Sequence, residues 1–349
     1  MKKIVFDCER MKYPHTGLYH YCYHLGLALQ KNYDPEKLEF YYYIKKNTFG
    51  IFGEKANYIA QHSLQKFILP STKQFDIWHT NYQGTQYFPK KRQLKIVLTI
   101  HDLNFLHENK KTEEKKKEEI EKIQKKIERA DHIVAISEFV LNDIKNHFRL
   151  NGQPTSVIYN GCNININDEI SMPSDLPKGK YLYTIGTITD KKNFHVLPSL
   201  LVDNDLFLVI SGIILNKEYY EKIIKEAKYH KVEKRVIFTG AVNESEKKWY
   251  MQNCEAFVFP SIAEGFGLPV IEAMFFGKPV ILSTHTSLPE IGGNDAYYFN
   301  SFDPEVMRSS LYECISSFDN NRAGRLRERA ISFKWENAAS SYLNIYENL

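Results

Sequence analysis

The sequence predicts an α/β protein with two domains, each built on a parallel sheet. Three observations support this expectation. Short apolar runs alternate with helical patterns along the whole chain, which is typical of parallel α/β architecture. The chain has 349 residues, too many for one ordinary core and enough for two packed domains. The pattern lapses once, between Gly161 and Lys180, where turn-forming residues indicate an interdomain linker.

The first half is predicted to contain six strands, at Lys3–Asp7, Glu39–Ile44, Asp76–Thr80, Lys95–His101, His132–Ser137 and Ser156–Tyr159. Thr16–Gln30 and Thr112–Arg129 are predicted to be helices. In the second helix Lys and Glu interleave with only a few isoleucines, so we interpret it as a solvated element. An approach to anionic lipid is the alternative, although membrane-surface helices usually have a wider apolar stripe.

The second half is predicted to contain five strands, at Tyr181–Ile185, Leu206–Ser211, Val236–Thr239, Ala256–Pro260 and Pro279–Ser283. Each half is therefore α/β, and two Rossmann-like domains that face each other are expected. The final helix, Trp335–Asn348, fits either half on sequence grounds.

Composition narrows the compartment and the class of ligand. The five cysteines are scattered and form no Cys-x-x-Cys pair, which favours a reducing cytoplasm over a disulfide framework or a zinc site. The amino terminus lacks a signal-peptide pattern, and no run approaches the ~18 apolar residues of a membrane-spanning helix. We therefore expect a soluble, cytoplasmic protein, at most peripheral on the inner face of the membrane. A net charge of +4 is compatible with anionic ligands but is far from the basic stripe that nucleic-acid binding usually demands.

The most informative motif runs from Ser261 to Glu272 and follows the apolar run Ala256–Phe259. It therefore begins at the carboxyl end of a predicted strand, where open α/β sheets bind ligands. Gly265 and Gly267 remove side chains, so a ligand can approach the backbone closely.

A short helix is predicted directly after these glycines. Pro269 suits the first turn of a helix from Leu268 to Phe276, and a helix N-terminus favours a phosphate group. Glu264 precedes this phosphate cradle and Glu272 lies about one turn into the helix. Carboxylates on both sides of a phosphate site suit a nucleotide sugar, which carries ribose at one end and hexose at the other.

Glu264 and Glu272, separated by seven residues within EGFGLPVIEA, resemble the signature of family 4 (GT4) of the GT-B-fold glycosyltransferases. Two surface glutamates on an ordinary turn are the alternative, and the full string favours the family. The resemblance implies a GT-B fold with an acceptor domain of residues 1–165 and a nucleotide-sugar domain of residues 178–334. It also implies that the last helix, 335–349, crosses back to the first domain. Retention of configuration and independence of metal are properties of the family and are not read from the spacing.

A second motif, Gly186 to Asn193, resembles the family loop G-T-x-x-P-R-K-N, whose basic pair holds the donor diphosphate. Lys192 matches the family lysine, and Lys191 replaces its arginine, which keeps the charge but loses the planar fork. Asp190 replaces the common proline. Alone, two lysines after a strand indicate a solvated turn, but beside the glutamate motif they favour a diphosphate site. Two fixed cations stabilise the charge of a departing diphosphate, a role that other transferases give to a divalent metal.

The first domain carries further family matches. Gly17 lies in a loop that resembles the family's T-G-I-G-R-Y, but Tyr19 and His20 replace its second glycine and its arginine. His101 and Asp102 resemble the strand-end I-H-D whose histidine lies against the donor sugar. A histidine at this position is otherwise a structural hydrogen-bonding residue.

By this resemblance, the catalytic residues are His101, Lys192 and Glu264. The donor-binding residues are Gly17, Asp102, Gly186, Lys191, Lys192, Val242, Glu264, Gly265, Phe266, Gly267, Leu268 and Glu272. No cofactor and no metal are expected. Asp203-Asn-Asp205 matches the D-x-D pattern of metal-dependent transferases, but it precedes a strand and is interpreted as a turn.

The lysine-loop variant resembles bacterial mannosyl- and rhamnosyltransferases of O-antigen and capsule assembly. We therefore expect transfer of a hexose, with GDP-mannose as the favoured donor and UDP-hexoses and dTDP-rhamnose as alternatives. The acceptor is expected to be a glycan or a lipid-diphosphate-linked hydroxyl. A lipid-linked acceptor would bring the enzyme to an anionic membrane, where the Lys-rich helix could assist.

Other classes fit the sequence less well. A sugar-nucleotide epimerase on the same fold has no need of the paired lysines, and glycogen- or starch-type enzymes are usually longer. No Gly-x-Gly-x-x-Gly follows the first strand, which argues against a nicotinamide-dependent dehydrogenase. A non-catalytic GT-B scaffold that binds partners is the alternative of another class, because of the departures at Tyr19, His20 and Lys191.

Overall fold

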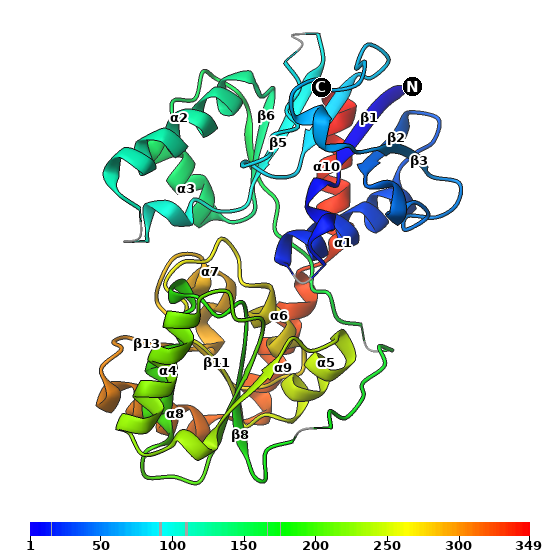
Figure 1. The fold of residues 1–349 in the computed structure, drawn as a ribbon. Helices are drawn as coiled ribbons and strands as arrows, with labels where there is room; N and C mark the ends of the chain where they lie inside the picture. Colours follow the sequence, from blue (N-terminus) through cyan, green and yellow to red (C-terminus); the bar gives the residue numbers. More distant parts are fainter. Residues whose placement is uncertain (15, 91–92, 109–110, 166, 175) are drawn as a thin grey trace. The chain divides into compact units, whose positions relative to one another are not determined.

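The chain forms two compact units, each with its own parallel sheet (Figure 1). The computed structural model describes residues 1–14, 16–90, 93–108, 111–165, 167–174 and 176–349. The first unit comprises Met1–Gly161 and Phe333–Leu349, and the second comprises Cys162–Ser332. The predicted α/β class with two Rossmann-like sheets is confirmed.

The first unit contains a seven-stranded sheet with the order β3-β2-β1-β4-β5-β6-β7 and parallel pairing throughout. Its strands are β1 (Lys2–Asp7), β2 (Leu38–Ile44), β3 (Asn57–Ala60), β4 (Ile77–Thr80), β5 (Lys95–Ile100), β6 (His132–Ala135) and β7 (Thr155–Val157). The central strands β1, β4 and β5 read as nearly continuous apolar runs because helices cover both faces of the sheet. The sequence missed β3, a four-residue strand at the edge whose side chains are only partly buried.

Three helices follow strands in this unit, namely α1 (Gly17–Asn32), α2 (Glu113–Arg129) and α3 (Glu138–His147). Each begins at a hydroxyl N-cap that accepts a backbone N–H three residues ahead. The N-caps are Thr16, Thr112 and Ser137. On α2, Ile123 and Ile127 are buried and most charged residues are exposed, which agrees with a solvated surface helix. Lys126 and Arg129 are among the exceptions, because they donate to backbone carbonyls of the first unit.

The C-terminal helix α10 (Trp335–Asn348) lies beside α1 in the first unit (Figure 1). Tyr342 places its hydroxyl 2.8 Å from both Thr99 Oγ1 and Tyr21 Oη. The Tyr346 hydroxyl lies 2.5 Å from His79 Nδ1. The sequence pattern left open which half of the chain α10 covers. These hydrogen bonds to β4, β5 and α1 place it on the first unit.

The second unit contains a six-stranded parallel sheet with the order β10-β9-β8-β11-β12-β13. Its strands are β8 (Tyr181–Ile185), β9 (Phe207–Ser211), β10 (Val236–Gly240), β11 (Ala256–Phe259), β12 (Val280–Ser283) and β13 (Tyr297–Phe299). Its helices are α4 (Lys217–Tyr229), α5 (Glu244–Asn253), α6 (Leu268–Phe275), α7 (Leu288–Gly292), α8 (Pro304–Ser317) and α9 (Asn320–Ser332). The strand order reverses between β8 and β11, and ligands bind at such a switch point in open α/β sheets.

The segment expected as a linker packs along the second unit. Lys248 forms an ion pair with Asp168 at 2.9 Å, and Ser245 Oγ donates to the carbonyl of Glu169 at 3.0 Å. Tertiary contacts that no local pattern signals therefore hold much of this segment. In the described part of the chain, no helix has both the length and the apolar character needed to cross a bilayer.

Candidate functional site

Two loops of the second unit meet at the switch point of its sheet. The lysine loop follows β8 and the glutamate loop follows β11, and these strands pair directly. The backbone N–H of Ile262 donates to the carbonyl of Lys191 at 2.8 Å and joins the two loops. Residues about seventy positions apart in the sequence are thereby brought together at the carboxyl edge of the sheet.

Lys192 and Glu264 form the central ion pair of this site. Lys192 Nζ lies 2.6 Å from Glu264 Oε1 and 4.7 Å from the centroid of the Phe259 ring. The two side chains are only 11% and 13% exposed. The sequence shows Lys192 and Glu264 only in separate motifs, and the fold brings their side chains into direct contact.

Burial and neighbouring charge set the ionisation of the pair. Burial lowers the pKa of Lys192 below its ordinary value, and Lys191 acts in the same direction while Glu264 opposes both. Burial acts to raise the pKa of Glu264, but the positive charges of Lys192 and Lys191 outweigh it and hold that pKa below its ordinary value. Glu264 is therefore a carboxylate at neutral pH, held beside two lysines.

Gly186 makes the space that Lys192 occupies. A Cβ at Gly186 would lie 2.8 Å from Lys192 Cε, and its φ of +156° disfavours a side chain. Gly212, which follows the neighbouring strand β9, packs against the backbone of Gly186. A Cβ added at Gly212 would collide with the carbonyl oxygen of Gly186. The sequence singled out Gly186 but missed Gly212, whose partner belongs to another strand.

The glutamate loop is fixed from behind by the loop after β12. The N–H of Glu264 donates to Thr286 Oγ1 at 3.0 Å, and Ser287 Oγ donates to the carbonyls of Glu264 and Phe266. Gly267, with φ of +106°, provides the N-cap of α6 and leaves the helix without a side-chain cap. Pro269 has no N–H, and the N–H of Val270 donates to the carbonyl of Gly267 at 2.9 Å. The helix therefore offers an anion mainly the positive end of its dipole.

Glu272 is buried and held within its own unit. Its carboxylate accepts hydrogen bonds from Asn163 Nδ2 at 2.9 Å and from Lys247 Nζ at 3.1 Å. Burial acts to lower the pKa of Lys247, but Glu272 and Glu244 outweigh it and raise that pKa. The sequence missed Lys247 and Asn163, because neither carries a motif. Val242, the other donor-binding candidate of this unit, is half-buried in the loop after β10.

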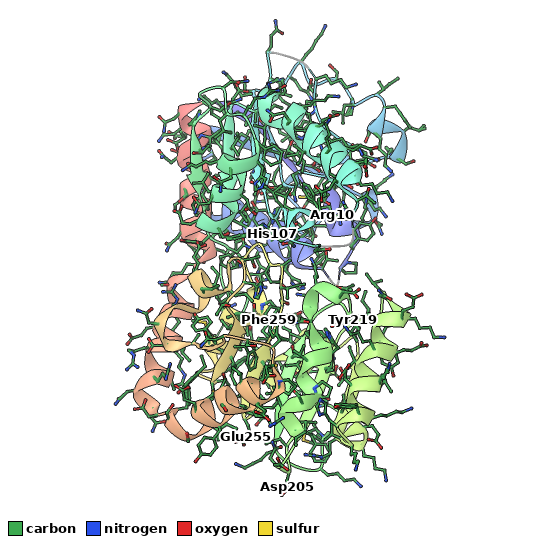
Figure 2. All side chains as sticks on the ribbon, turned by 90° about the vertical axis from the view of Figure 1, so that its left-hand side faces the viewer. Arg10, His107, Asp205, Tyr219, Glu255 and Phe259 are labelled. Carbon is green, nitrogen blue, oxygen red and sulfur yellow. The ribbon has the colours of Figure 1, made fainter. Side chains whose placement is uncertain are left out.

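The Asp203-Asn-Asp205 segment lies at the other end of the sheet. It precedes β9, and Asp203 has a φ of +61°, typical of a turn. Figure 2 labels Phe259 at one end of the second unit and Asp205 and Glu255 at the opposite end. Within the described residues, no cluster of three or more His, Cys, Asp or Glu side chains is arranged to hold a metal ion.

In the first unit, His101 follows β5 and is 6% exposed. Its Nε2 lies 2.9 Å from the carbonyl oxygen of Asn81, and the Tyr21 ring packs edge-on with centroids 4.4 Å apart. Burial lowers the pKa of His101 to about 3, so the ring is neutral at physiological pH. Because a carbonyl only accepts, Nε2 carries the proton and Nδ1 keeps its lone pair.

The other predicted residues of this unit make contacts of their own. Asp102 accepts a hydrogen bond from the N–H of Asn104 at 3.2 Å. Gly17 is the exposed first residue of α1. Tyr19, in the place of a family glycine, lies in the first turn of α1 and stacks with Tyr23 at a centroid distance of 6.1 Å, so this turn is bulkier than a glycine would make it.

Both halves of the chain match models of known protein families. Residues 12–166 match the family described as Glycosyltransferase Family 4, and residues 167–330 match the family described as Glycosyl transferases group 1. The two matches are contiguous and follow the two halves of the chain. The chain belongs to the family 4 glycosyltransferases.

Curated relatives of this family 4 chain include O-antigen enzymes. It is 28% identical over 235 residues to the serotype-specific mannosyltransferase WbdA of Escherichia coli, which covers 61% of the chain and 28% of that protein. It is 29% identical over 202 residues to the O-antigen chain mannosyltransferase RfbU of Salmonella typhimurium, covering 56% and 55% respectively. The chain thus spans between about a quarter and about half the length of these two relatives. It is 24% identical to the O-antigen chain mannosyltransferase B of Escherichia coli, with 99% and 100% covered.

Solved structures show the same fold over the whole chain. The sucrose-phosphate synthase of Thermosynechococcus elongatus superposes with a TM-score of 0.76 at 18% identity, covering 100% of this chain and 99% of that one. HepE of Anabaena, solved with UDP and glucose, has a TM-score of 0.76 at 15% identity and full coverage of both chains. These likenesses confirm the predicted GT-B fold.

The family motifs did not identify a charged cluster after β1. Glu9 is buried and pairs with Lys12 at 2.7 Å, while Arg10 lies 4.5 Å from the centroid of the Tyr82 ring. Burial, followed by the charge of Glu9, raises the pKa of Asp7 well above its ordinary value. The cluster shares the carboxyl edge of the first sheet with His101, a position that only the strand order reveals.

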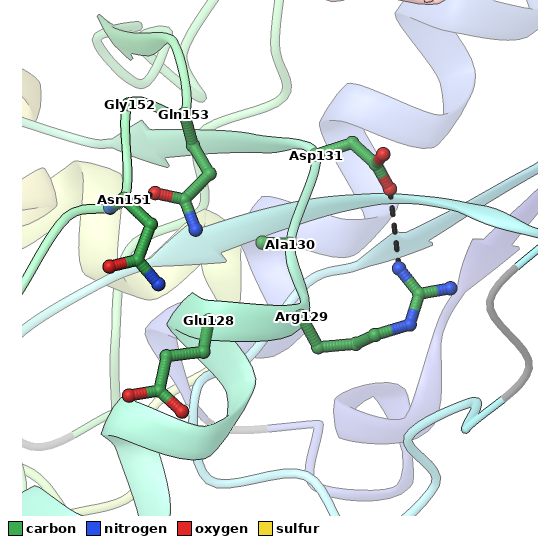
Figure 3. A pocket seen from close by; sticks show the side chains of 7 residues that line it. All are labelled: Glu128, Arg129, Ala130, Asp131, Asn151, Gly152 and Gln153. Atoms are coloured by element: carbon green, nitrogen blue, oxygen red, sulfur yellow. Dashed lines mark hydrogen bonds and ion pairs between the residues drawn. The ribbon is translucent and has the colours of Figure 1, made fainter.

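A pocket of about 600 Å³ lies elsewhere in the first unit (Figure 3). It is lined by Glu128, Arg129, Ala130, Asp131, Asn151, Gly152 and Gln153. Asp131 precedes β6, so the pocket lies at the amino edge of the sheet, opposite His101. Arg129 and Lys95 both pair with Asp131, which gives these residues a structural role.

Proposed function

We propose that the chain is a hexosyltransferase that moves a sugar from a nucleotide-sugar donor to an acceptor hydroxyl in surface-glycan synthesis. The observation that carries this proposal is the buried Lys192–Glu264 pair at the switch point, beside Lys191 and the uncapped N-terminus of α6. GDP-mannose is the favoured donor because three relatives are named as mannosyltransferases. UDP-hexoses and dTDP-rhamnose are the alternatives.

The cations stabilise the leaving group. As the bond between the anomeric carbon and the diphosphate breaks, negative charge grows on the phosphate oxygens. Lys191, Lys192 and the positive end of the α6 dipole supply fixed positive charge for it, so no divalent metal is needed. Glu264 then orients the transferred hexose.

The acceptor oxygen replaces the diphosphate on the face of the anomeric carbon from which the diphosphate leaves, which retains the anomeric configuration. The acceptor oxygen bonds to the anomeric carbon, and its proton passes to the departing phosphate. By the family resemblance, His101 is assigned to a sugar hydroxyl, and its Nδ1 lone pair is able to accept a hydrogen bond. The acceptor is a glycan or a lipid-diphosphate-linked hydroxyl.

Ribose binding is assigned to Glu272. A carboxylate offers about four acceptor positions, and Asn163 and Lys247 engage only part of them. Their contacts fix the carboxylate in one orientation. A ribose hydroxyl then donates to a carboxylate that is already preorganised.

Replacing the central pair tests the proposal. Removing one partner of a buried ion pair strands the other charge and can unfold the site, so the informative variant is the double Lys192→Gln/Glu264→Gln. We expect it to fold but to lose donor turnover by about a hundredfold or more. Donor turnover is measured as release of nucleoside diphosphate.

The control is Lys180→Gln, which breaks the Lys180–Glu255 pair of 3.2 Å at the opposite end of the same unit. It should retain activity within about twofold, since exposed pairs contribute little. Near-normal turnover in a folded double variant would refute the assignment of the site.

A further inference from the structure

Three bulky apolar side chains stand in solvent directly after the edge strand β3. Leu64, Phe67 and Ile68 are 77%, 82% and 81% exposed, on and just after the short helix η3 (Ser63–Lys66). A second run of exposed apolar residues is less exposed, with Ile213, Ile214 and Leu215 at 37%, 47% and 69%. The remaining described apolar residues of similar exposure stand apart from one another in the sequence. Single exposed apolar residues are ordinary, whereas a cluster marks an interaction surface.

The same stretch carries the positive charge of the molecule. Residues 45–75 contain five lysines and one acid, Glu54, which gives a charge of 5 − 1 = +4, equal to the formal charge of the whole chain. The rest of the chain is therefore balanced. The lysines, all exposed, are Lys45, Lys46, Lys55, Lys66 and Lys73.

Sheet geometry gathers part of this charge beside the apolar residues. β2 and β3 are parallel neighbours, so Lys45 and Lys46, after β2, emerge at the same edge as η3, after β3. Tyr43 donates to Gln65 Oε1 at 2.6 Å and ties η3 to β2. We call Lys45, Lys46, Leu64, Lys66, Phe67 and Ile68 the basic-apolar surface.

This surface shares the carboxyl edge of the first sheet with the candidate catalytic residue of that unit. His101 follows β5, and the cluster of Glu9 and Arg10 follows β1 in the same parallel sheet. A partner that covers the basic-apolar surface therefore lies on the edge where acceptor-side residues emerge.

We propose that the basic-apolar surface docks on an anionic lipid bilayer. Leu64, Phe67 and Ile68 enter the interfacial layer, and the lysines face the lipid phosphates, the arrangement that suits interfacial protein segments. A second copy of the chain is a poorer occupant, because it would bring two positively charged surfaces together. Attachment of the protein to the bilayer does not depend on which sugar is transferred. Only the idea that attachment helps the protein to reach a lipid-linked acceptor rests on the proposed function.

Helix α2, the other lysine-rich element, lacks these properties. Residues 113–129 contain seven basic and six acidic side chains, 7 − 6 = +1. Lys116 pairs with Glu113 at 3.1 Å and Lys122 with Glu119 at 3.7 Å. We therefore assign membrane contact to the basic-apolar surface and not to α2, the helix that the sequence suggested.

Vesicle flotation of the full-length protein tests the inference. The vesicles contain phosphatidylcholine alone or with about 30 mol% phosphatidylglycerol, an anionic lipid. We expect the protein to bind the anionic vesicles at least about tenfold better and to be released by salt. Two variants, Leu64→Ser/Phe67→Ser/Ile68→Ser and Lys45→Ser/Lys46→Ser/Lys66→Ser, should each lose about tenfold in binding or more.

Two controls match these variants in residue number or exposure. Lys115→Ser/Lys116→Ser/Lys117→Ser removes three lysines from α2, and Tyr229→Ser/Tyr312→Ser removes two aromatic side chains that are 77% and 76% exposed. Both should bind vesicles like the wild type. Donor turnover in solution should be unchanged in both surface variants, which separates failure of attachment from failure of the proposed function.

Three outcomes overturn the inference. One is absence of binding to anionic vesicles by the wild type, and another is undiminished binding by both surface variants. The third is loss of binding in the α2 variant alone. Light scattering adds a further check, since a dimer that the apolar variant converts to monomer, without vesicle binding, would assign the surface to a second copy.

Discussion

Burial sets the protonation state of the residues at the carboxyl edges of the two sheets. It keeps His101 neutral with the proton on Nε2, and it leaves Glu264 ionised only because Lys192 and Lys191 are adjacent. The motifs predicted His101, Lys192 and Glu264, since each follows a strand in a family pattern. They did not predict that Lys192 and Glu264 touch, or that Lys247 and Asn163 hold Glu272, because those contacts depend on strand adjacency.

The neutral state of His101 makes stability depend on pH. The folded pKa of about 3 lies below the ordinary value of 6.5, so the unfolded chain binds more protons between these values. The stabilisation is present above pH 6.5 and is lost progressively as the pH falls toward 3. At about 1.4 kcal/mol per pH unit, this amounts to about 2 kcal/mol between pH 6.5 and 5.

Urea unfolding at pH 7 and pH 5 measures this effect. His101→Gln keeps a donor for the Asn81 carbonyl but cannot titrate, so its stability should fall less than that of the wild type on acidification. His62→Gln, at an exposed histidine, should keep the wild-type slope. An identical loss of stability in wild type and His101→Gln would show that His101 is not held neutral by the fold.

At the scale of elements, buried polar contacts fix the C-terminal helix to the first sheet. Tyr342 and Tyr346 of α10 meet Thr99 of β5, His79 of β4 and Tyr21 of α1. The apolar periodicity of α10 predicted a helix, but it left open which domain the helix covers. β3 and β13 were missed because strands of three or four residues at a sheet edge carry too short a pattern.

Removing one hydroxyl tests this arrangement. Tyr342→Phe leaves Thr99 Oγ1 and Tyr21 Oη each without one partner, and we expect unfolding to become easier by about 1–3 kcal/mol. Urea unfolding provides the measurement, with Tyr312→Phe, at a residue 76% exposed, as the control. Equal stability of the two variants would mean that the hydroxyl of Tyr342 does not fasten α10.

At the scale of the whole molecule, each unit contributes its own set of polar residues at a carboxyl edge. The second unit supplies the Lys192–Glu264 pair and Lys191, and the first supplies His101 with the Glu9–Arg10 cluster. The fold and the main motif residues follow from the sequence because α/β alternation and strand-end motifs are local patterns. The identity of the donor does not follow from the sequence, because the predicted contacts go to diphosphate, ribose and hexose, which nucleotide sugars share.

The most direct test of the central claim is release of nucleoside diphosphate from GDP-mannose, UDP-hexoses and dTDP-rhamnose in the presence of excess EDTA. We expect the protein to release GDP from GDP-mannose faster than it turns over the other donors. The chelator should leave this release intact, and Lys192→Gln/Glu264→Gln should abolish it. Absence of release from every nucleotide sugar by folded protein, or undiminished release by the double variant, would contradict the account.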